Sequence, residues 1–249
     1  MLKRELSKGL FRYVFEPLPG HRFCTNIYAL VSGGSVLLID SGYAFMGEQV
    51  LGDINECGWN IEGVIISHFH DDHMEGLKVL PDVTVYGSGR YNETLELWTE
   101  KDERHYYTPS VLIENERTIA FKEHAVRMIP FPGHSPCTLL TLIDDKYLHI
   151  ADELIFSEQG EPVLPVTDPG CIQRHADALC MLKRYGRYLF MPGHGPEFSG
   201  SNSIHNEIDK RLAYYNAILS AGREITYEEA IIGCGGGFLH SEWHADIYE

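Results

Sequence analysis

Basic side chains are scarce in this chain of 249 residues, where 20 lysines and arginines are set against 36 aspartates and glutamates, giving a formal net charge of −16. Such a charge repels phosphate backbones and disfavours a nucleic-acid-binding protein. No apolar run approaches the ~18–20 residues of a membrane helix, which disfavours a membrane protein. Near the amino terminus, Arg12 and Glu16 interrupt the apolar stretch that a secretion signal requires.

Cysteines are few, six in all, and none are paired as C-x-x-C. This usage predicts reduced thiols and a cytoplasmic location. Low-complexity stretches, charge blocks and Pro/Ser linkers are also lacking, while 44% of the residues are hydrophobic, enough for a sizeable core. We therefore expect a single domain over residues 1–249, with a C-terminal helical extension and tail from about residue 200.

The first half of the chain predicts a hairpin, a helix and a buried strand in that order. Apolar runs at 28–31 and 36–39 flank a Gly-Gly pair, as in a β-hairpin, and the second run ends at Asp40. A helix around 46–57 and a short apolar strand at 64–66 follow. His68 comes directly after that strand.

The second half repeats this order. A hairpin over 139–150 precedes Asp152, a helix is expected at about 173–185, and a strand at 188–191 leads to His194. Two sheets built in this way would pack face to face with helices outside. We therefore predict an α/β fold, an αββα sandwich of two mixed β-sheets. Loops at the strand ends would carry the functional groups.

The C-terminal extension is expected to begin with an exposed helix over 204–221. Its apolar residues share one face: Ile208, Leu212, Tyr215 and Leu219. Thr226 and Glu229 then form a capping-box pattern before a short helix. His240, Trp243 and His244 fall in a stretch that we predict to be a flexible tail with incidental histidines. Metal binding by the two histidines, or docking of the tail on a partner subunit, are the alternatives.

Histidines are the unusual feature of the composition, thirteen in all. Four potential metal ligands follow the predicted strand 64–66 within six positions: His68, His70, Asp72 and His73. A strand-to-helix loop folds back on itself and can bring them together, and imidazole with carboxylate suits zinc and related ions. Scattered surface histidines are the alternative, and this spacing disfavours it.

Two further histidines follow Pro-Gly turns that end apolar stretches. His134 lies in Pro-Gly-His-Ser and His194 in Pro-Gly-His-Gly. Together with Asp152, they complete a set of seven potential ligands. Seven ligands suffice for two metal ions, each with an open position.

These residues, in this order, resemble the metallo-β-lactamase superfamily, and in particular its glyoxalase II-like hydrolases. The resemblance covers nearly the whole chain. It implies that His68, His70 and His134 hold a first metal. It further implies that Asp72, His73 and His194 hold a second, that Asp152 bridges the two, and that Asp40 supports the site from behind. We interpret Asp71 as a solvated or structural carboxylate.

The chemistry implied is that of a metal-dependent hydrolase that cleaves a small ester, thioester or lactone with a metal-bridging hydroxide. Its cofactors would be two divalent metal ions, with zinc favoured and iron or manganese as alternatives. Asp72 would have a catalytic role, orienting the nucleophile or accepting a proton. β-Lactamases of this fold generally have a cysteine where this chain has Asp152, so antibiotic hydrolysis is disfavoured.

Three alternatives to that hydrolase stay open. One is an oxidoreductase similar to the persulfide dioxygenases, which use a single iron. Another is a small phosphodiester hydrolase, and the third is a non-catalytic scaffold. The expected partner is a small-molecule substrate, with no nucleic acid and no membrane, and a homodimer is a further possibility.

Some residues outside the ligand set are secondary candidates. The Tyr-rich segment 101–109 is either a lid over the site or an ordinary loop. His21 and Cys137 are interpreted as a surface residue and a buried structural thiol. Residues 154–156 are apolar and are interpreted as core, with the lining of an acyl pocket as the alternative.

Overall fold

The first of two sheets contains the N-terminal strands in sequence order. The computed structural model describes residues 1–248. Strands β1 to β4 pair antiparallel, whereas β4 to β7 pair parallel, so the sheet is mixed. Its seven strands are β1 (Leu2–Ser7), β2 (Leu10–Phe15), β3 (Thr25–Ser32), β4 (Ser35–Ile39), β5 (Asn60–Ile65), β6 (Thr84–Ser88) and β7 (Val111–Ile113).

The second sheet is also mixed and has five strands in the order β12-β11-β10-β9-β8. Only β11 and β12 are parallel, among these neighbours within residues 1–248. The strands are β8 (Arg117–Phe121), β9 (His124–Pro130), β10 (Leu139–Ile143), β11 (Tyr147–His149) and β12 (Leu189–Met191).

The two sheets pack against each other through a shared apolar layer. Leu30 and Ile39 of the first sheet belong to the same buried cluster as Val126, Met128 and Leu139 of the second. Alternate residues of each strand point to opposite faces, so each sheet has a second apolar face to cover.

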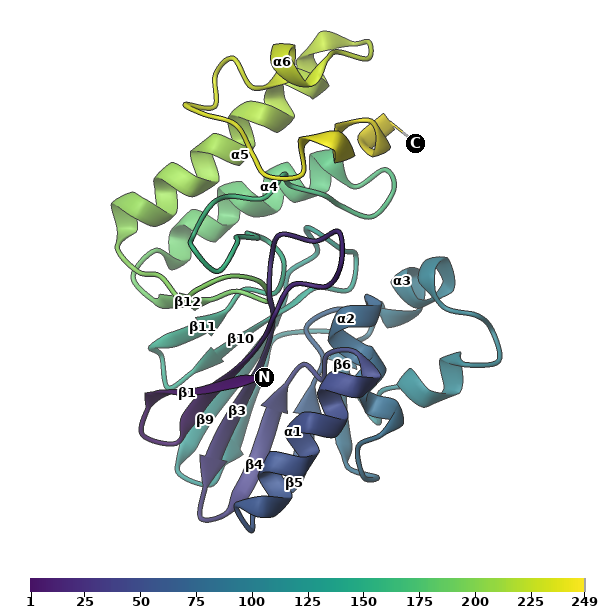
Figure 1. Cartoon of the computed structure of the whole chain (residues 1–249), viewed down its shortest axis with the longest axis vertical. Helices are drawn as coiled ribbons and strands as arrows, with labels where there is room; N and C mark the ends of the chain where they lie inside the picture. Colours follow the sequence, from purple (N-terminus) through teal and green to yellow (C-terminus); the bar gives the residue numbers. More distant parts are fainter. Residues whose placement is uncertain (249) are drawn as a thin grey trace.

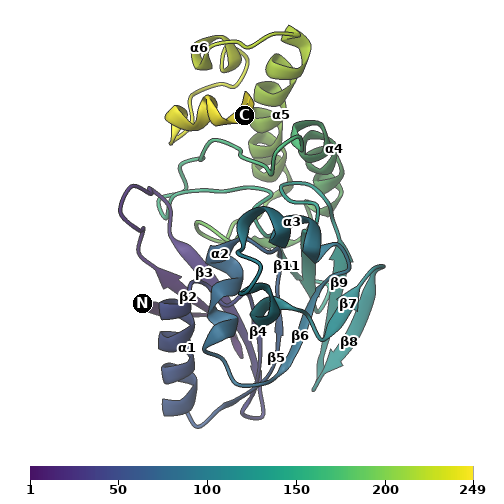
Figure 2. The ribbon, with the colours of Figure 1, turned by 90° about the vertical axis from the view of Figure 1, so that its right-hand side faces the viewer.

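Helices cover those outer faces. Helix α1 (Ala44–Glu56) buries Met46, Val50 and Ile54 against the first sheet. Helices α4 (Ile172–Leu182) and α5 (Ser201–Ala221) cover the second sheet in a separate cluster. Helices therefore lie outside both sheets, with α1 beside the lower part of the strands and α4 and α5 above them in both views (Figures 1 and 2). This is the predicted αββα sandwich.

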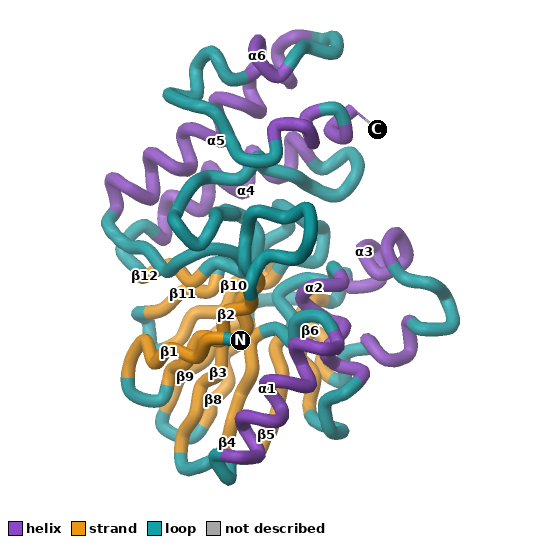
Figure 3. The backbone as a smooth tube through the Cα atoms, viewed as in Figure 1, coloured by secondary structure: helices purple, strands orange, loops and turns teal. Residues whose placement is uncertain are grey.

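The remaining helical segments are short and lie in the connections. They are α2 (Asp71–Met74), α3 (Tyr91–Trp98), α6 (Tyr227–Ala230) and the 3₁₀ turns η1 (Glu75–Lys78), η2 (Arg104–Tyr107), η3 (Lys183–Tyr185), η4 (Ser241–His244) and η5 (Asp246–Tyr248). Many loops gather between the strands and the C-terminal helices (Figure 3). No helix of the described chain is both long and apolar enough to cross a bilayer.

The predicted order of elements is found in both halves. β3 and β4 form the first hairpin and β10 and β11 the second, and each is followed by a helix and a strand that lead to His68 and His194. The capping box at Thr226 is also present, because Thr226 accepts from the backbone N–H of Glu229 and Glu229 accepts in return.

Two predictions for the C-terminal extension are wrong. Helix α5 is not an exposed helix, since Ile208, Leu212 and Tyr215 are buried against α4 and the second sheet, and only Leu219 of the predicted face is exposed. The predicted flexible tail also packs against the rest of the protein. His240 and His244 are buried, and the chain around them packs on α5.

Candidate metal centre

Four of the predicted ligands come from one chain reversal between β5 and α2. β5 ends at Ile65 and His70 immediately precedes α2, so the backbone changes direction between His68 and Asp71. The turn brings the rings of His68 and His73 together, with centroids 4.1 Å apart and an interplanar angle of 45°. Because β5 leads through this turn into the short helix α2, His68 and His70 before the helix lie close to Asp72 and His73 within it.

The other three ligands come from the second sheet. His134 follows β9, Asp152 follows β11 and His194 follows β12. The three strands are neighbours or near neighbours in one sheet, so their ends meet at the same edge. The structure therefore brings all seven predicted residues together from both sheets.

The Pro-Gly pairs before His134 and His194 have a steric reason. A Cβ on Gly193 would overlap the Asp152 carboxylate and lie 2.7 Å from Cε1 of His73. A Cβ on Gly133 would overlap the carboxylate of Glu153. Only glycine permits so close an approach of the backbone to these carboxylates.

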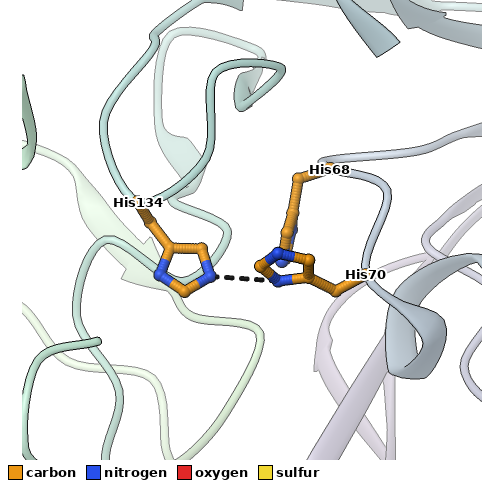
Figure 4. Close-up of side chains that lie close together, drawn as sticks. All are labelled: His68, His70 and His134. Carbon is orange, nitrogen blue, oxygen red and sulfur yellow. Dashed lines mark hydrogen bonds between the residues drawn. The ribbon is translucent and has the colours of Figure 1, made fainter. Parts of the chain in front are cut away.

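One group of three histidines converges on a single point. The nearest nitrogens of His68, His70 and His134 all lie within 4.8 Å of one another, and Nε2 of His134 is 3.2 Å from Nδ1 of His70 (Figure 4). Three imidazoles at this separation form a site of the kind that binds a transition metal.

A second group lies beside the first. It contains Asp72, His73 and His194, with Nε2 of His194 3.2 Å from Oδ2 of Asp72. Asp152 stands between the groups, because its Oδ2 is 3.0 Å from Nε2 of His194 and 3.9 Å from Nε2 of His68. One carboxylate is thus within reach of ligands from both groups.

The opposite ring nitrogens are fixed by acceptors, which defines the tautomers. Nδ1 of His134 donates to the Val166 carbonyl at 2.7 Å, and Nδ1 of His194 donates to the Cys24 carbonyl at 2.7 Å. A carbonyl can only accept, so each Nδ1 carries the proton and each Nε2 is left with a lone pair in the neutral ring. Such contacts orient histidine ligands toward a metal.

Asp40 performs the same function for His73. It accepts from Nδ1 of His73 at 2.8 Å and from both the backbone N–H and the hydroxyl of Ser67 at 2.7 and 2.8 Å. Asp40 has a positive φ of 64° at the end of β4, a conformation that aspartate tolerates better than most residues. The carboxylate therefore lies behind the site, as the resemblance implied.

Asp168 contacts the candidate site and was not identified from the sequence. Its Oδ1 is 2.9 Å from Nε2 of His70 and accepts from Nε1 of Trp98 at 2.7 Å. His70 thereby turns its Nδ1 inward, unlike the other ligands. Asp168 lies in an irregular loop between β11 and α4, and no spacing rule links it to His70.

Asn26 and Tyr28 of β3 are also missing from the predicted set. Nδ2 of Asn26 donates to the carbonyls of Pro192 and Gly195, and the Tyr28 hydroxyl donates to Pro192. The turn that carries His194 is thus held from the first sheet. An asparagine within an apolar strand is a usable signal, since buried amides are almost always hydrogen-bonded.

Burial and mutual proximity divide the histidines into two kinds. Burial lowers the pKa of His134 to about 4 and, together with His73 and His70 nearby, holds the pKa of His68 well below its ordinary value. These two rings are neutral at pH 7. Burial opposes charge on His194 as well, but Asp152 and Asp72 outweigh it and raise its pKa to about 10.

The carboxylate between the two groups, Asp152, is ionised although it is buried. Burial alone would raise the pKa of Asp152, but His194 and His73 hold it well below its usual range. Two buried atoms of the ligand set have no hydrogen-bond partner within residues 1–248, Nε2 of His68 and Oδ1 of Asp152. Buried polar atoms without partners are rare. Neutral imidazoles, ionised carboxylates and these unpartnered atoms all fit bound metal ions.

A cavity of about 720 Å³ opens onto this centre. His70, Asp72, His134, Asp152 and His194 line its floor. A volume of this size is typical of small-molecule sites. The ligand set is therefore accessible to a substrate.

The secondary candidates have the expected burial, but His21 and Ile155 also line the cavity. His21 has an exposed side chain but lines the cavity. Segment 101–109 does not line the cavity, whereas Trp98, just before it, does. Ile155 also lines it, while Leu154 and Phe156 belong to the core cluster. Cys137 is buried as predicted, and all six cysteines are free thiols.

The αββα fold and its cluster of histidine and aspartate ligands are together typical of metal-dependent hydrolases. The metallo-beta-lactamase superfamily model matches residues 23–194, a segment that contains all seven predicted ligands. The chain belongs to this superfamily.

The chain is similar to several known proteins at low identity. It is 25% identical over 219 residues to an atrochrysone carboxyl ACP thioesterase of Aspergillus fumigatus, covering 86% of this chain and 64% of that protein. It is 25% identical over 186 residues to a beta-lactamase-like protein 2 homolog of Caenorhabditis elegans, covering 69% and 56%. The chain thus spans between half and two thirds of the length of these curated relatives.

Solved structures share the fold. A metallo-beta-lactamase from Pontibacter korlensis superposes with a TM-score of 0.67 at 15% identity, over 86% of this chain and 98% of that one. At this identity the likeness concerns the fold alone.

Proposed function

We propose that this protein is a metal-dependent hydrolase of a small ester, thioester or lactone. The observation that carries the proposal is the pair of ligand groups that share Asp152 at the floor of an open cavity. His68, His70 and His134 would hold one divalent ion, and Asp72, His73 and His194 would hold the other. We favour zinc, the usual ion of histidine-rich hydrolytic sites.

Two cations bound in this way would supply Lewis acidity and make water available as a nucleophile near neutral pH. The chain's own residues arrange the reaction. Asp72 lines the cavity and its side chain is 19% exposed, so it can accept a hydrogen bond from the attacking water and orient it. Asp152 and His68 are buried, so bulk water would reach the centre mainly from the cavity.

Thioesters are the first substrate class to test, because one relative carries the name of an ACP thioesterase. A small phosphodiester is less compatible with this cavity, since no lysine or arginine is among its lining residues. Phosphate recognition normally uses such cations or helix N-termini. The similarity to glyoxalase II-like enzymes remains part of the proposal, as does a cytoplasmic location.

The first experiment is elemental analysis of protein purified without chelator or added metal, followed by assay of thioesters, esters and lactones. Two zinc ions per chain with turnover support the proposal. One iron and little zinc, with oxygen consumption on a persulfide, would move the function to the dioxygenase class.

A matched pair of variants tests the bridging role. Asp152→Asn should reduce both metal content and kcat/KM by at least about 100-fold, because the shared carboxylate loses its charge. Asp177→Asn makes the same chemical change on the exposed side of α4 and should leave both unchanged. Full activity of Asp152→Asn would contradict the proposed site.

A further inference from the structure

Apolar rings stand beside the ligand histidines on both sides of the cavity. The Phe23 ring lies 4.7 Å from the His194 ring, and the Trp98 ring lies 5.8 Å from the His70 ring, centroid to centroid. Trp98 is half-exposed but fixed, because its Nε1 donates to Asp168. A substrate at the metal centre would therefore have an aromatic surface on each flank.

The C-terminal segment closes a third side of the cavity. Trp243 and Ile247 line it, although Trp243 is 49 residues beyond His194, the last of the seven ligands in the chain. Trp243 stacks on His240 with ring centroids 4.0 Å apart and an interplanar angle of 9°. The segment thus presents an indole face as part of the wall.

That wall is anchored to the body of the protein. Nε2 of His244 donates to the Ile225 carbonyl at 2.7 Å, which leaves Nδ1 to accept from the Tyr214 hydroxyl at 2.7 Å. Backbone bonds join Leu239 to Pro162 and Leu164, just beyond Asp152 in the chain. The C-terminal segment is therefore a fixed component of the cavity.

The charge of the cavity excludes one class of substrate. None of its lining residues is lysine or arginine. Asp71 and Asp246 line it, are exposed, and form no ion pair within residues 1–248. An anionic group held away from the metal centre would lose hydration near these carboxylates without gaining a lysine or arginine as partner.

We propose that the substrate is an ester, thioester or lactone with an apolar acyl part, aromatic or alkyl, and no anionic group. This inference rests on the proposed hydrolytic function and specifies its substrate class. Trp243, Trp98 and Phe23 bind the acyl part, and Asp71 and Asp246 reject anions such as glutathione conjugates. The C-terminal segment, through Trp243 and Asp246, is then one of the parts of the chain that set specificity.

Binding of non-hydrolysable analogues tests the substrate class independently of catalysis. The zinc-loaded protein is titrated calorimetrically with S-phenethyl-N-acetylcysteamine, which is neutral, and with S-phenethylglutathione, which is anionic. We expect the neutral thioether to bind at least about tenfold more tightly. Equal or tighter binding of the glutathione compound would overturn the inference.

Turnover of three thioesters then tests the acyl preference. We expect kcat/KM for S-phenylacetyl-N-acetylcysteamine to exceed that for its S-acetyl analogue and for S-phenylacetylglutathione by about tenfold or more, as expected for several buried carbons. Turnover without these preferences contradicts the substrate class and leaves the hydrolase proposal intact. The expected binding preference without any turnover contradicts the hydrolase proposal and leaves the binding preference intact.

Variants connect the preference to named side chains. Trp243→Ala should lower the phenylacetyl-to-acetyl ratio by about tenfold, whereas Trp243→Phe should keep most of it. Asp246→Lys should raise relative binding of the glutathione thioether, and Asp246→Asn should do so less. Ile232→Ala, at an 84% exposed position of the same extension, is the control and should change neither ratio. Unchanged ratios in both Trp243→Ala and Asp246→Lys would refute the assignment of the wall.

Discussion

Replacing Asp40 with asparagine should loosen one metal and leave the other in place. Asp40 accepts from Nδ1 of His73 at 2.8 Å, which keeps the proton away from Nε2, the atom facing Asp152 and His194. The amide of asparagine can still accept from the Ser67 backbone N–H. Its NH₂ group, however, would face Nδ1 as a donor and favour the tautomer with the proton on Nε2.

The size of the effect follows from the role of the lost contact. Outer contacts of this kind typically change metal affinity by about 10- to 100-fold, or about 1.4–2.7 kcal/mol. The first group is linked to Asp40 less directly, because the Ser67 hydroxyl, which donates to Asp40, lies between Asp40 and Nδ1 of His68 at 3.1 Å. Its metal affinity should therefore change less. The metal-free protein should also lose about 1.5–3 kcal/mol of unfolding free energy, since the lost hydrogen bond is buried and charged.

The assay is competition for zinc with a chromophoric chelator, resolved into two binding steps, together with urea unfolding of the metal-free protein. Asp144→Asn is the matched control, because Asp144 also has a positive φ, 52°, but is exposed at the β10–β11 turn. Two zinc ions bound to Asp40→Asn at wild-type affinity would refute the argument that Asp40 selects the tautomer of His73.

Three other outcomes follow from the site and its surroundings. Gly193→Ala should lower the unfolding free energy by about 1–3 kcal/mol and release metal, because its Cβ would collide with Asp152 and His73. Gly52→Ala has open space around its Cβ and should be neutral or stabilising in the same urea unfolding measurement. Burial lowers the pKa of His149 to about 4, below the unfolded value near 6.5, so its neutral form stabilises the fold above pH 6.5 and this stability is lost as pH falls toward 4. Between pH 7 and pH 5 the metal-free wild type should lose about 2 kcal/mol more unfolding free energy than the metal-free His149→Gln variant. An unchanged pH dependence of stability would contradict this. When each metal is present at a free concentration of about 1,000 times its Kd, chelation should lower the unfolding free energy by about 4 kcal/mol per site and lower Tm. An unchanged Tm would argue against a structural contribution of the metals.

The sequence predicted best those features that depend on neighbouring residues. The hairpin at Gly33-Gly34, the helix after Asp40 and the turn carrying His68 all follow from local periodicity and turn chemistry. Two copies of one order of elements then sufficed to predict the sandwich. The seven potential ligands were found from the His-rich stretch after the strand 64–66, from the two Pro-Gly turns before His134 and His194, and from Asp152 at the end of the second hairpin.

Features that depend on tertiary packing were predicted poorly. Asp168 meets His70 across 98 positions of sequence, and nothing in its Thr-Asp-Pro-Gly context indicates a partner. The C-terminal segment contains glycines and charges that locally favour a mobile tail. Its order comes from His244 bridging Tyr214 and Ile225, contacts that exist only once α5 is in place.

The charges of the carboxylates and histidines at the centre determine how its two ligand groups respond to pH. Asp72 and Asp152 are ionised beside His194, whose pKa they raise to about 10 against the effect of burial. A proton on His194 therefore supplies positive charge where a metal would supply it, so protons and cations compete for the second group. The first group differs, because burial lowers the pKa of His134 to about 4 and its ring is neutral without any metal. The two groups should consequently differ in how strongly their metal affinity depends on pH, with the Asp72, His73 and His194 group the more dependent.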